Sequence, residues 1–294
     1  MKRLLVVVLF ALCVAGSANA QARASAAKVQ YGSNAAAGHT FTHDGVKLYY
    51  EVYGSGEPLL IIHGNGGSIR DVRRQIAYFR TKYKVIAMDS RDQGKSGDSQ
   101  GALTYEKMAG DLAALIDHVS VGPVNILGWS DGGIEALILG MKYPLKVKKI
   151  VAMAANLNPS SEALQPEAIS LLKQFITSMP ADDKLSPEQR REFKAAKMAL
   201  VEPNIDPKEL EAIKAPTLVL ASDHDLIRDE HTLEIYHHIP NSELEIFPGA
   251  THAIPFEDPK TFNAAVERFL SKPFVKIDRI PDTMKSLEKM RGPK

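Results

Sequence analysis

Short apolar runs alternate with amphipathic stretches along most of this chain, and that alternation constrains the fold more than any other feature. Several runs are almost wholly apolar, as in PLLIIHG, which is typical of strands buried on both faces of a sheet. Runs of strand length occupy residues 45–54, 58–64, 83–89, 123–129, 147–154, 216–222 and 242–248. Stretches with helical periodicity lie near residues 69–80, 105–119, 132–142, 228–238 and 259–271. Strands that alternate with helices predict an α/β fold, with a mostly parallel central sheet and helices on both faces.

The alternation breaks once, between residues 156 and 214, where the sequence is polar, helical and without a strand. An insertion of this length predicts a small helical cap on a core that comprises residues 41–155 and 215–271. One face of its first helix is an apolar stripe, which we expect to pack within the cap or to line a substrate cavity: Leu171, Leu172, Phe175, Ile176 and Met179. Residues 21–40 are predicted to form a flexible arm, and residues 272–294 a basic tail.

The first residues of the chain predict a secretory signal peptide over residues 1–20. A short basic start precedes an apolar run over residues 4–14, and the segment ends in the small residues ANA. A transmembrane anchor is disfavoured, because the run is well short of the roughly 20 residues that span a bilayer. We therefore expect cleavage after Ala20 and a periplasmic or secreted protein. The only cysteine, Cys13, lies in this segment, so the mature protein would have no disulfide and no thiolate nucleophile.

Charge and histidine spacing argue against several classes of partner. The formal net charge is +1, with no basic field, so we expect no nucleic acid, and no membrane contact after signal cleavage. His224, His231, His237 and His238 lie close in sequence. However, His231 and His237 are six residues apart, whereas metal ligands on one helical face favour a spacing of four. We expect no metal and no cofactor, and the oligomeric state is left open.

The sequence GWSDGG, residues 128–133, lies between an apolar strand and the helix that follows it. The pattern G-x-S-x-G in this context indicates a nucleophile elbow, in which the hydroxyl of Ser130 projects above the sheet. Gly128 and Gly132 lack Cβ atoms, so neighbouring backbone can pass close to the turn. The positive end of the helix dipole lies near the hydroxyl and favours negative charge there.

A serine hydroxyl needs a base, and the base needs an orienting acid. On this arrangement of elements the expected chain order is serine, acid, histidine. Asp223 and Asp225 end one strand in LASDHD, and His252 follows the next strand in GATH. Both loops leave the carboxyl ends of predicted parallel strands, where open α/β sheets bind ligands.

Developing negative charge on a substrate oxygen needs two backbone donors. The first is the N–H of Asp131, directly after the serine. The second is expected from the loop HGNGGS, where we choose Asn65. His63 in the same loop is a tempting base, but we interpret it as a structural residue that orders the loop.

These motifs, together with DSRDQGKSG, make the chain resemble the α/β-hydrolase superfamily over nearly all of its mature length. The resemblance implies a catalytic triad of Ser130, Asp225 and His252. It also implies an oxyanion hole formed by the backbone N–H groups of Asn65 and Asp131. Two positions depart from the family pattern, Asp92 and Ser222, where glycine is usual or common. Both departures are expected to alter loops and not the chemistry.

GWSDGGI more narrowly resembles the valacyclovirase-like, or biphenyl-hydrolase-like, branch of that superfamily. That branch uses the acid that matches Asp131 to bind the amino group of amino-acid esters. The resemblance makes Asp131 and Trp129 candidate substrate-binding residues. The alternative is that the Asp131 side chain points to solvent or caps the first turn of its helix.

We therefore expect an exported serine hydrolase that cleaves carboxylic esters of small substrates through an acyl-enzyme. A C–C bond or lactone hydrolase with the same triad is the first alternative. The alternative of another class is a ligand receptor on this fold with little turnover, since fold alone does not fix function.

Overall fold

The computed structural model describes residues 29–119 and 122–291, and its centre is one eight-stranded sheet. The strand order is β1-β2-β4-β3-β5-β6-β7-β8; β1, β2 and β4 pair antiparallel, and all other neighbours pair parallel. The strands are β1 Gly38–His43, β2 Val46–Tyr53, β3 Glu57–Ile62, β4 Tyr83–Met88, β5 Val124–Trp129, β6 Val147–Met153, β7 Thr217–His224 and β8 Ser242–Thr251. The predicted mostly parallel sheet of an α/β fold is confirmed.

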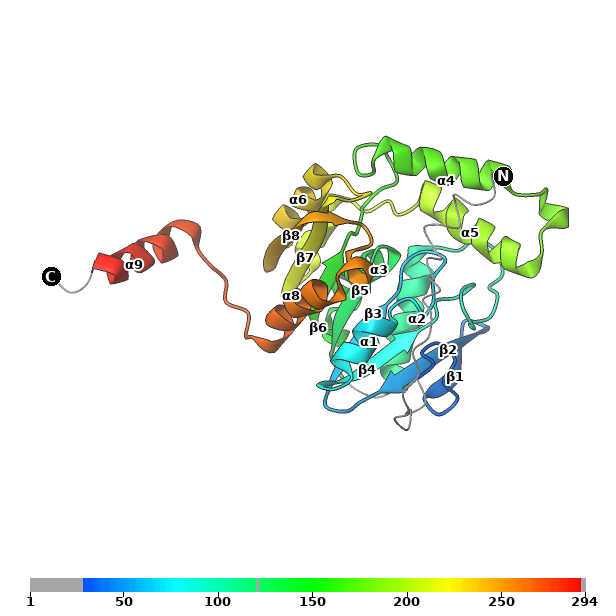
Figure 1. The fold of residues 1–294 in the computed structure, drawn as a ribbon, viewed down its shortest axis with the longest axis horizontal. Helices are drawn as coiled ribbons and strands as arrows, with labels where there is room; N and C mark the ends of the chain where they lie inside the picture. The colour runs from blue at the N-terminus through cyan, green and yellow to red at the C-terminus, as the bar shows by residue number, and fades with distance from the viewer. Residues whose placement is uncertain (1–28, 120–121, 292–294) are drawn as a thin grey trace, which may run out of the picture.

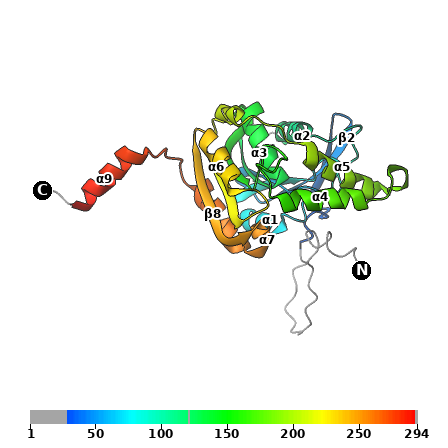
Figure 2. The ribbon, with the colours of Figure 1, turned by 90° about the horizontal axis from the view of Figure 1, so that it is seen from above.

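Helices cover both faces of this sheet, as predicted (Figures 1 and 2). One face packs against α2 Tyr105–His118, α3 Asp131–Lys142 and α6 Asp229–His238, and the other against α1 Arg73–Phe79 and α8 Pro259–Ser271. Helix α1 begins four residues later than the predicted 69–80. The short α7, Ile254–Glu257, follows β8. Each face encloses its own apolar cluster, because the central strands are buried on both sides.

Between β6 and β7 the chain leaves the core and forms α4 Pro166–Ser178 and α5 Pro187–Val201, which pack together above the sheet (Figure 1). Ser186 begins α5 with a capping box, in which its hydroxyl and the Gln189 side chain each accept a backbone N–H of the other residue. No residue of α4 is fully buried, and Leu171 of its apolar stripe is exposed. The packed face expected for this helix is therefore only partly covered.

The segment predicted as a flexible arm differs from the expectation in its described part. Strand β1 begins at Gly38, inside the range 21–40, and forms the edge of the sheet beside β2. Just before it, the N–H groups of Gly32 and Asn34 donate to the carboxylate of Glu51, which is fully buried in β2. These bonds anchor the segment, so the arm does not extend to residue 40. The predicted signal peptide lies outside the described residues.

The predicted basic tail contains a helix, α9 Arg279–Arg291, that extends away from the body of the protein (Figures 1 and 2). Its apolar side chains are exposed, for example Ile280 and Met290. Within the described part of the chain, no helix is both long and apolar enough to cross a membrane.

Candidate active site

Ser130 occupies a sharp turn between β5 and α3, with φ of 57° and ψ of −120°. A side chain at this φ is strained, so the turn depends on its neighbours for support. A Cβ on Gly128 would lie 2.0 Å from the Gly132 carbonyl oxygen, and one on Gly132 would lie 2.5 Å from that of Ile62. Both glycines are thus required by close backbone approach, as the sequence indicated.

Two hydrogen bonds link Ser130 to His252 and Asp225. His252 Nε2 lies 3.0 Å from Ser130 Oγ, and His252 Nδ1 lies 2.6 Å from Asp225 Oδ1. Asp225 is buried, and its carboxylate also accepts the backbone N–H groups of Ser222 and Ile227. This arrangement fixes the imidazole with Nδ1–H toward the acid and Nε2 toward the hydroxyl.

Asp223, the other acidic candidate, faces away from this cluster. Its carboxylate accepts the backbone N–H groups of Gly249 and Ala250, at 2.9 and 3.2 Å. These bonds hold the pKa of Asp223 below its usual value. The structure therefore brings Ser130, His252 and Asp225 together, whereas Asp223 binds the backbone near the end of β8.

The two backbone N–H groups expected to face a substrate oxygen flank Ser130. A Cβ on Gly64, next to Asn65, would lie 3.2 Å from Ser130 Cβ, so the loop after β3 passes directly beside the serine. Among the described residues, the backbone N–H groups of Asn65 and Asp131 have no hydrogen-bond acceptor in the protein. Both donors are therefore free to bind a ligand oxygen.

The side chain of Asp131 neither points to solvent nor caps its helix, so the simpler of the two expectations for it is wrong. The residue is 5% exposed, and its carboxylate accepts hydrogen bonds from Asn65 Nδ2 at 2.8 Å and from the Tyr105 hydroxyl at 2.9 Å. Burial raises the pKa of Asp131 to about 6, while the two donors oppose that rise. Tyr105 was not foreseen, because no motif marks this residue at the start of α2.

Trp129 lies against the histidine loop. Its indole N–H donates to the His252 carbonyl oxygen at 2.9 Å, and its ring packs edge-on against Phe256 with centroids 4.8 Å apart. These contacts support the position of His252. A direct contact between Trp129 and substrate stays a prediction.

His63 is buried, and both ring nitrogens are used within the core. Nδ1 donates to the Gly64 carbonyl oxygen at 2.8 Å, and Nε2 accepts the Ser90 N–H at 3.1 Å. His63 therefore ties the loop after β3 to the loop after β4, which agrees with the structural role expected for it.

The two departures from the family pattern have different consequences. Asp92 has φ of 59°, a left-handed conformation that glycine adopts without strain. Its carboxylate accepts the Lys194 ammonium at 2.6 Å and the Ser99 N–H at 3.1 Å, so it links α5 of the cap to the core. Ser222 is buried near the end of β7, and its backbone N–H donates to the Asp225 carboxylate at 3.4 Å.

Three of the histidines considered as metal ligands lie on α6, and His224 ends β7. His231 is buried, where Nε2 accepts the Leu157 N–H at 2.9 Å and Nδ1 lies 3.0 Å from Glu234. In the part of the chain that the structure describes, no group of three or more His, Cys, Asp or Glu side chains is placed to hold a metal ion.

Comparison with known proteins places this geometry in a family. The profile of the α/β-hydrolase fold family matches residues 57–198. Serine hydrolase BPHL of Mus musculus is 30% identical over 253 residues, which cover 77% of this chain and 84% of that protein. The 3-oxoadipate enol-lactonase 2 of Acinetobacter baylyi is 28% identical over 259 residues, or 79% of this chain and 96% of that protein.

A solved structure of a thermophilic esterase from Thermogutta terrifontis, with malate bound, shares the fold with a TM-score of 0.66 and 25% identity. The match covers 80% of this chain and 97% of that one. The chain therefore belongs to the α/β-hydrolase family, and the resemblance that its motifs suggested is confirmed.

Proposed function

We propose that this protein is an exported serine hydrolase that cleaves carboxylic esters of small substrates. The observation that carries the proposal is the chain of hydrogen bonds from Asp225 through His252 to Ser130. The esterase and serine hydrolase among the similar proteins support the same chemistry. Export is supported by the sequence of residues 1–20 alone.

Each of these residues has a defined role in this mechanism. His252 Nε2 takes the hydroxyl proton as Ser130 Oγ attacks the carbonyl carbon, and Asp225 stabilises the imidazolium that forms. The negative oxygen of the tetrahedral intermediate binds the backbone N–H groups of Asn65 and Asp131. His252 returns the proton to the leaving alcohol, which leaves an acyl group on Ser130. Water, deprotonated by His252, then attacks the acyl carbon, and the carboxylic acid and Ser130 are released.

Lactone hydrolysis is a second candidate, supported by the similarity to 3-oxoadipate enol-lactonase 2. A lactone is an internal ester, so the same steps apply and the alcohol stays attached to the acid product. Cleavage of a C–C bond by the same residues is a further alternative. A matched series of short-chain esters and lactones, compared by kcat/KM, ranks these substrates.

Asp131 is proposed to favour esters that carry an α-amino group. The resemblance of GWSDGGI to the valacyclovirase-like branch supports this preference. The carboxylate already accepts two hydrogen bonds, yet its two oxygens offer about four acceptor sites, so an ammonium can bind beside Asn65 and Tyr105.

The triad is tested by single substitutions, assayed on a chromogenic short-chain ester. Ser130→Ala and His252→Ala should each lower kcat by at least about 10³-fold with the fold retained, because the residues act as a unit. Asp225→Asn should lower kcat far more than Asp223→Asn, since only Asp225 reaches His252. The enzyme is taken from the periplasm or medium, and its mass should show Gln21 at the N-terminus.

Two outcomes would contradict the proposal. If the wild-type protein completes at most one slow turnover, the receptor alternative holds. If Asp223→Asn is the more damaging of the two carboxylate changes, the orienting acid is misassigned.

A further inference from the structure

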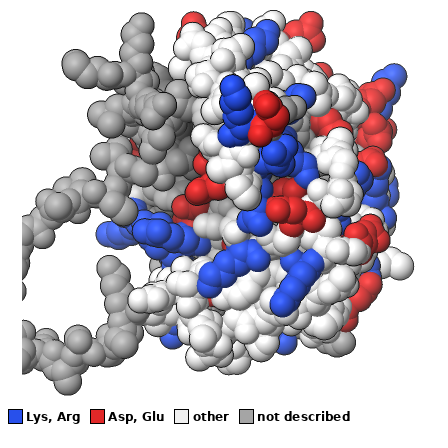
Figure 3. All heavy atoms as spheres, turned by 90° about the vertical axis from the view of Figure 1, so that its right-hand side faces the viewer, with Lys and Arg blue, Asp and Glu red and all other residues white. Residues whose placement is uncertain are grey.

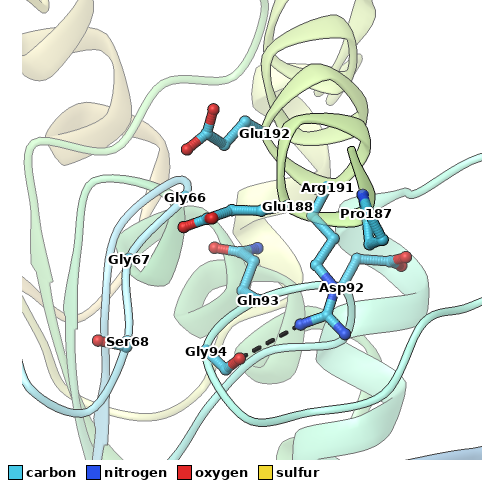
Figure 4. Close-up of a pocket in the computed structure, with 10 residues that line it drawn as sticks. All are labelled: Gly66, Gly67, Ser68, Asp92, Gln93, Gly94, Pro187, Glu188, Arg191 and Glu192. Atoms are coloured by element: carbon cyan, nitrogen blue, oxygen red, sulfur yellow. Dashed lines mark hydrogen bonds between the residues drawn. The ribbon is translucent and has the colours of Figure 1, made fainter. Parts of the chain in front are cut away.

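A cavity of about 500 Å³ lies under the cap, beside the site just described but separate from it. Its walls are the loop after β3 at Gly66–Ser68, the loop after β4 at Asp92–Gly94, and the first turns of α5 (Figure 4). Neither Ser130 nor His252 lines it. The side chain of Asn65 donates to the carbonyl oxygen of Ala195 in α5 at 3.1 Å, which joins the cap to the loop after β3.

Gln93 supplies the first sign that this cavity takes a ligand. The residue is 4% exposed, and neither atom of its side-chain amide has a hydrogen-bond partner among the described residues. A buried amide without partners is costly, and native proteins rarely leave one so. In Figure 4 this amide points into the cavity from the loop after β4. It offers one acceptor oxygen and two N–H donors to whatever binds there.

Glu188 and Glu192 supply the second sign, from the opposite wall. They are four residues apart on α5, so they lie on the same face of the helix, and both project into the cavity (Figure 4). In the described part of the chain neither carboxylate forms an ion pair. Partial burial and the neighbouring charge of Glu188 raise the pKa of Glu192. A bound cation would relieve the repulsion between these two like charges.

The other charged groups around the cavity are already neutralised. Arg191 pairs with Asp98 at 2.5 Å and donates to the Gly94 carbonyl oxygen, which directs its guanidinium along the wall (Figure 4). Asp92 is paired with Lys194 at 2.6 Å. Two uncompensated negative charges therefore face one unpaired amide.

We propose that this cavity is a binding site for a small organic cation with N–H donors, such as a primary amine. The ammonium binds between the carboxylates of Glu188 and Glu192, and donates to Gln93 Oε1. The site is distinct from the ester-binding site and does not rest on the function proposed above.

Isothermal titration calorimetry of the full-length protein with 1,4-diaminobutane, in the absence of any ester, tests the proposal. We expect saturable binding that Glu188→Gln/Glu192→Gln weakens at least about tenfold, because both ion pairs are lost. Gln93→Leu should weaken binding in the same direction, and tetramethylammonium, which has no N–H donor, should bind more weakly than the diamine. The glutamates are exposed on α5, so their double variant should fold even if Gln93→Leu does not.

The matched control is Glu211→Gln/Glu243→Gln, which removes the same charge at exposed positions outside the cavity. It should bind the diamine as the wild type does. The proposal is overturned if no saturable heat appears up to about 10 mM diamine, or if the control variant loses as much affinity as the cavity variant. Neither result bears on ester turnover at Ser130, which the titration does not measure.

Discussion

Asp131 combines two features that are unusual together: a buried carboxylate and a position directly beside the Ser130 hydroxyl. Burial favours its neutral form, whereas the hydrogen bonds from Asn65 and Tyr105 favour the charged form. The bond to Asn65 also holds the loop that carries one of the two free backbone donors. A substitution at Asp131 can therefore change the charge beside Ser130, the position of this loop, or both.

Asp131→Asn and Asp131→Ala separate these two effects. Asparagine keeps an acceptor for Asn65, and the Tyr105 hydroxyl can turn to accept from the new amide, so kcat/KM for a neutral ester should stay within about threefold. The preference for an α-amino ester over its des-amino analogue should fall by at least about tenfold, because the charge is gone. Alanine should lower both, since Asn65 loses its acceptor. A wild type without this preference, or an Asp131→Asn variant that keeps it, would show that the carboxylate does not bind substrate.

Ser130 is strained by its φ of 57°, which only glycine adopts freely. Ser130→Gly and Ser130→Ala both remove the hydroxyl, but only glycine relieves the backbone. We expect Ser130→Gly to exceed Ser130→Ala in free energy of unfolding by about 1–2 kcal/mol, even though glycine ordinarily costs stability. Urea unfolding of both variants measures the difference. If Ser130→Gly were instead less stable than Ser130→Ala by the roughly 0.5–1 kcal/mol that glycine ordinarily costs, the turn would store no strain at this residue.

At the scale of elements, α8 is fixed to the sheet through its last turn. Lys149 of β6 is 8% exposed, and its ammonium donates to the carbonyl oxygens of Phe269 and Leu270, at 2.9 and 3.1 Å, and to that of Lys272. A cation at this end of a helix also complements the helix dipole. Lys149 thus satisfies carbonyl groups that a helix end leaves without partners.

Lys149→Met should therefore lower the free energy of unfolding by about 2–3 kcal/mol, because it leaves buried carbonyl groups unpaired. Lys148→Met is the matched control: that side chain is 53% exposed and forms a surface ion pair with Glu57, which is worth about 0–1 kcal/mol. Thermal unfolding of both variants compares them. If the two substitutions cost the same, Lys149 contributes no more than a surface charge.

Elements were predictable where an apolar period marks them, as in β3 and α3, and were missed where it does not. Strand β1, with sequence GHTFTH, lies at the sheet edge and has no fully buried residue. Pairing with β2 holds it, together with contacts of the partly buried Phe41 and His43 with α2. Nothing local distinguishes such a strand from a loop. Helix α9 was also missed, because its segment was predicted only as a basic tail; its apolar side chains, such as Ile280 and Met290, are exposed.

The residues of the candidate site that lie in loops directly after strands were predictable from the sequence. Ser130, Asp225 and His252 each follow a strand, and the sheet brings the ends of those strands together. Two other contacts join segments far apart in the sequence. Asp131 contacts Tyr105, 26 residues away, and Asn65 contacts Ala195 in the cap, 130 residues away. No spacing rule links these positions, so only the folded structure reveals them.

For the whole molecule, carboxyl groups with opposite shifts set how stability depends on pH. Burial raises the pKa of Asp89 and raises that of Glu135 far above its usual value. Glu135 is fully buried in α3, and neither carboxylate oxygen has a hydrogen-bond partner among the described residues. Other carboxyl groups, such as those of Glu57 and Glu267, have a lowered pKa because each pairs with a lysine. Groups with a raised pKa destabilise the fold as pH rises, whereas groups with a lowered pKa stabilise it.

Glu135→Gln isolates a group with a raised pKa. In the unfolded chain Glu135 ionises near pH 4.3, but the folded protein keeps it protonated to a much higher pH. Stability is therefore lost as pH rises above about 4.3, by up to about 1.4 kcal/mol per pH unit, until the folded-state pKa is reached. Glutamine cannot ionise, so the variant should be more stable than wild type at pH 8 and closer to it at pH 5. Chemical unfolding at the two pH values, with exposed Glu243→Gln as the control, measures this change. A stability difference that is the same at both pH values would mean that Glu135 is ionised in the folded protein.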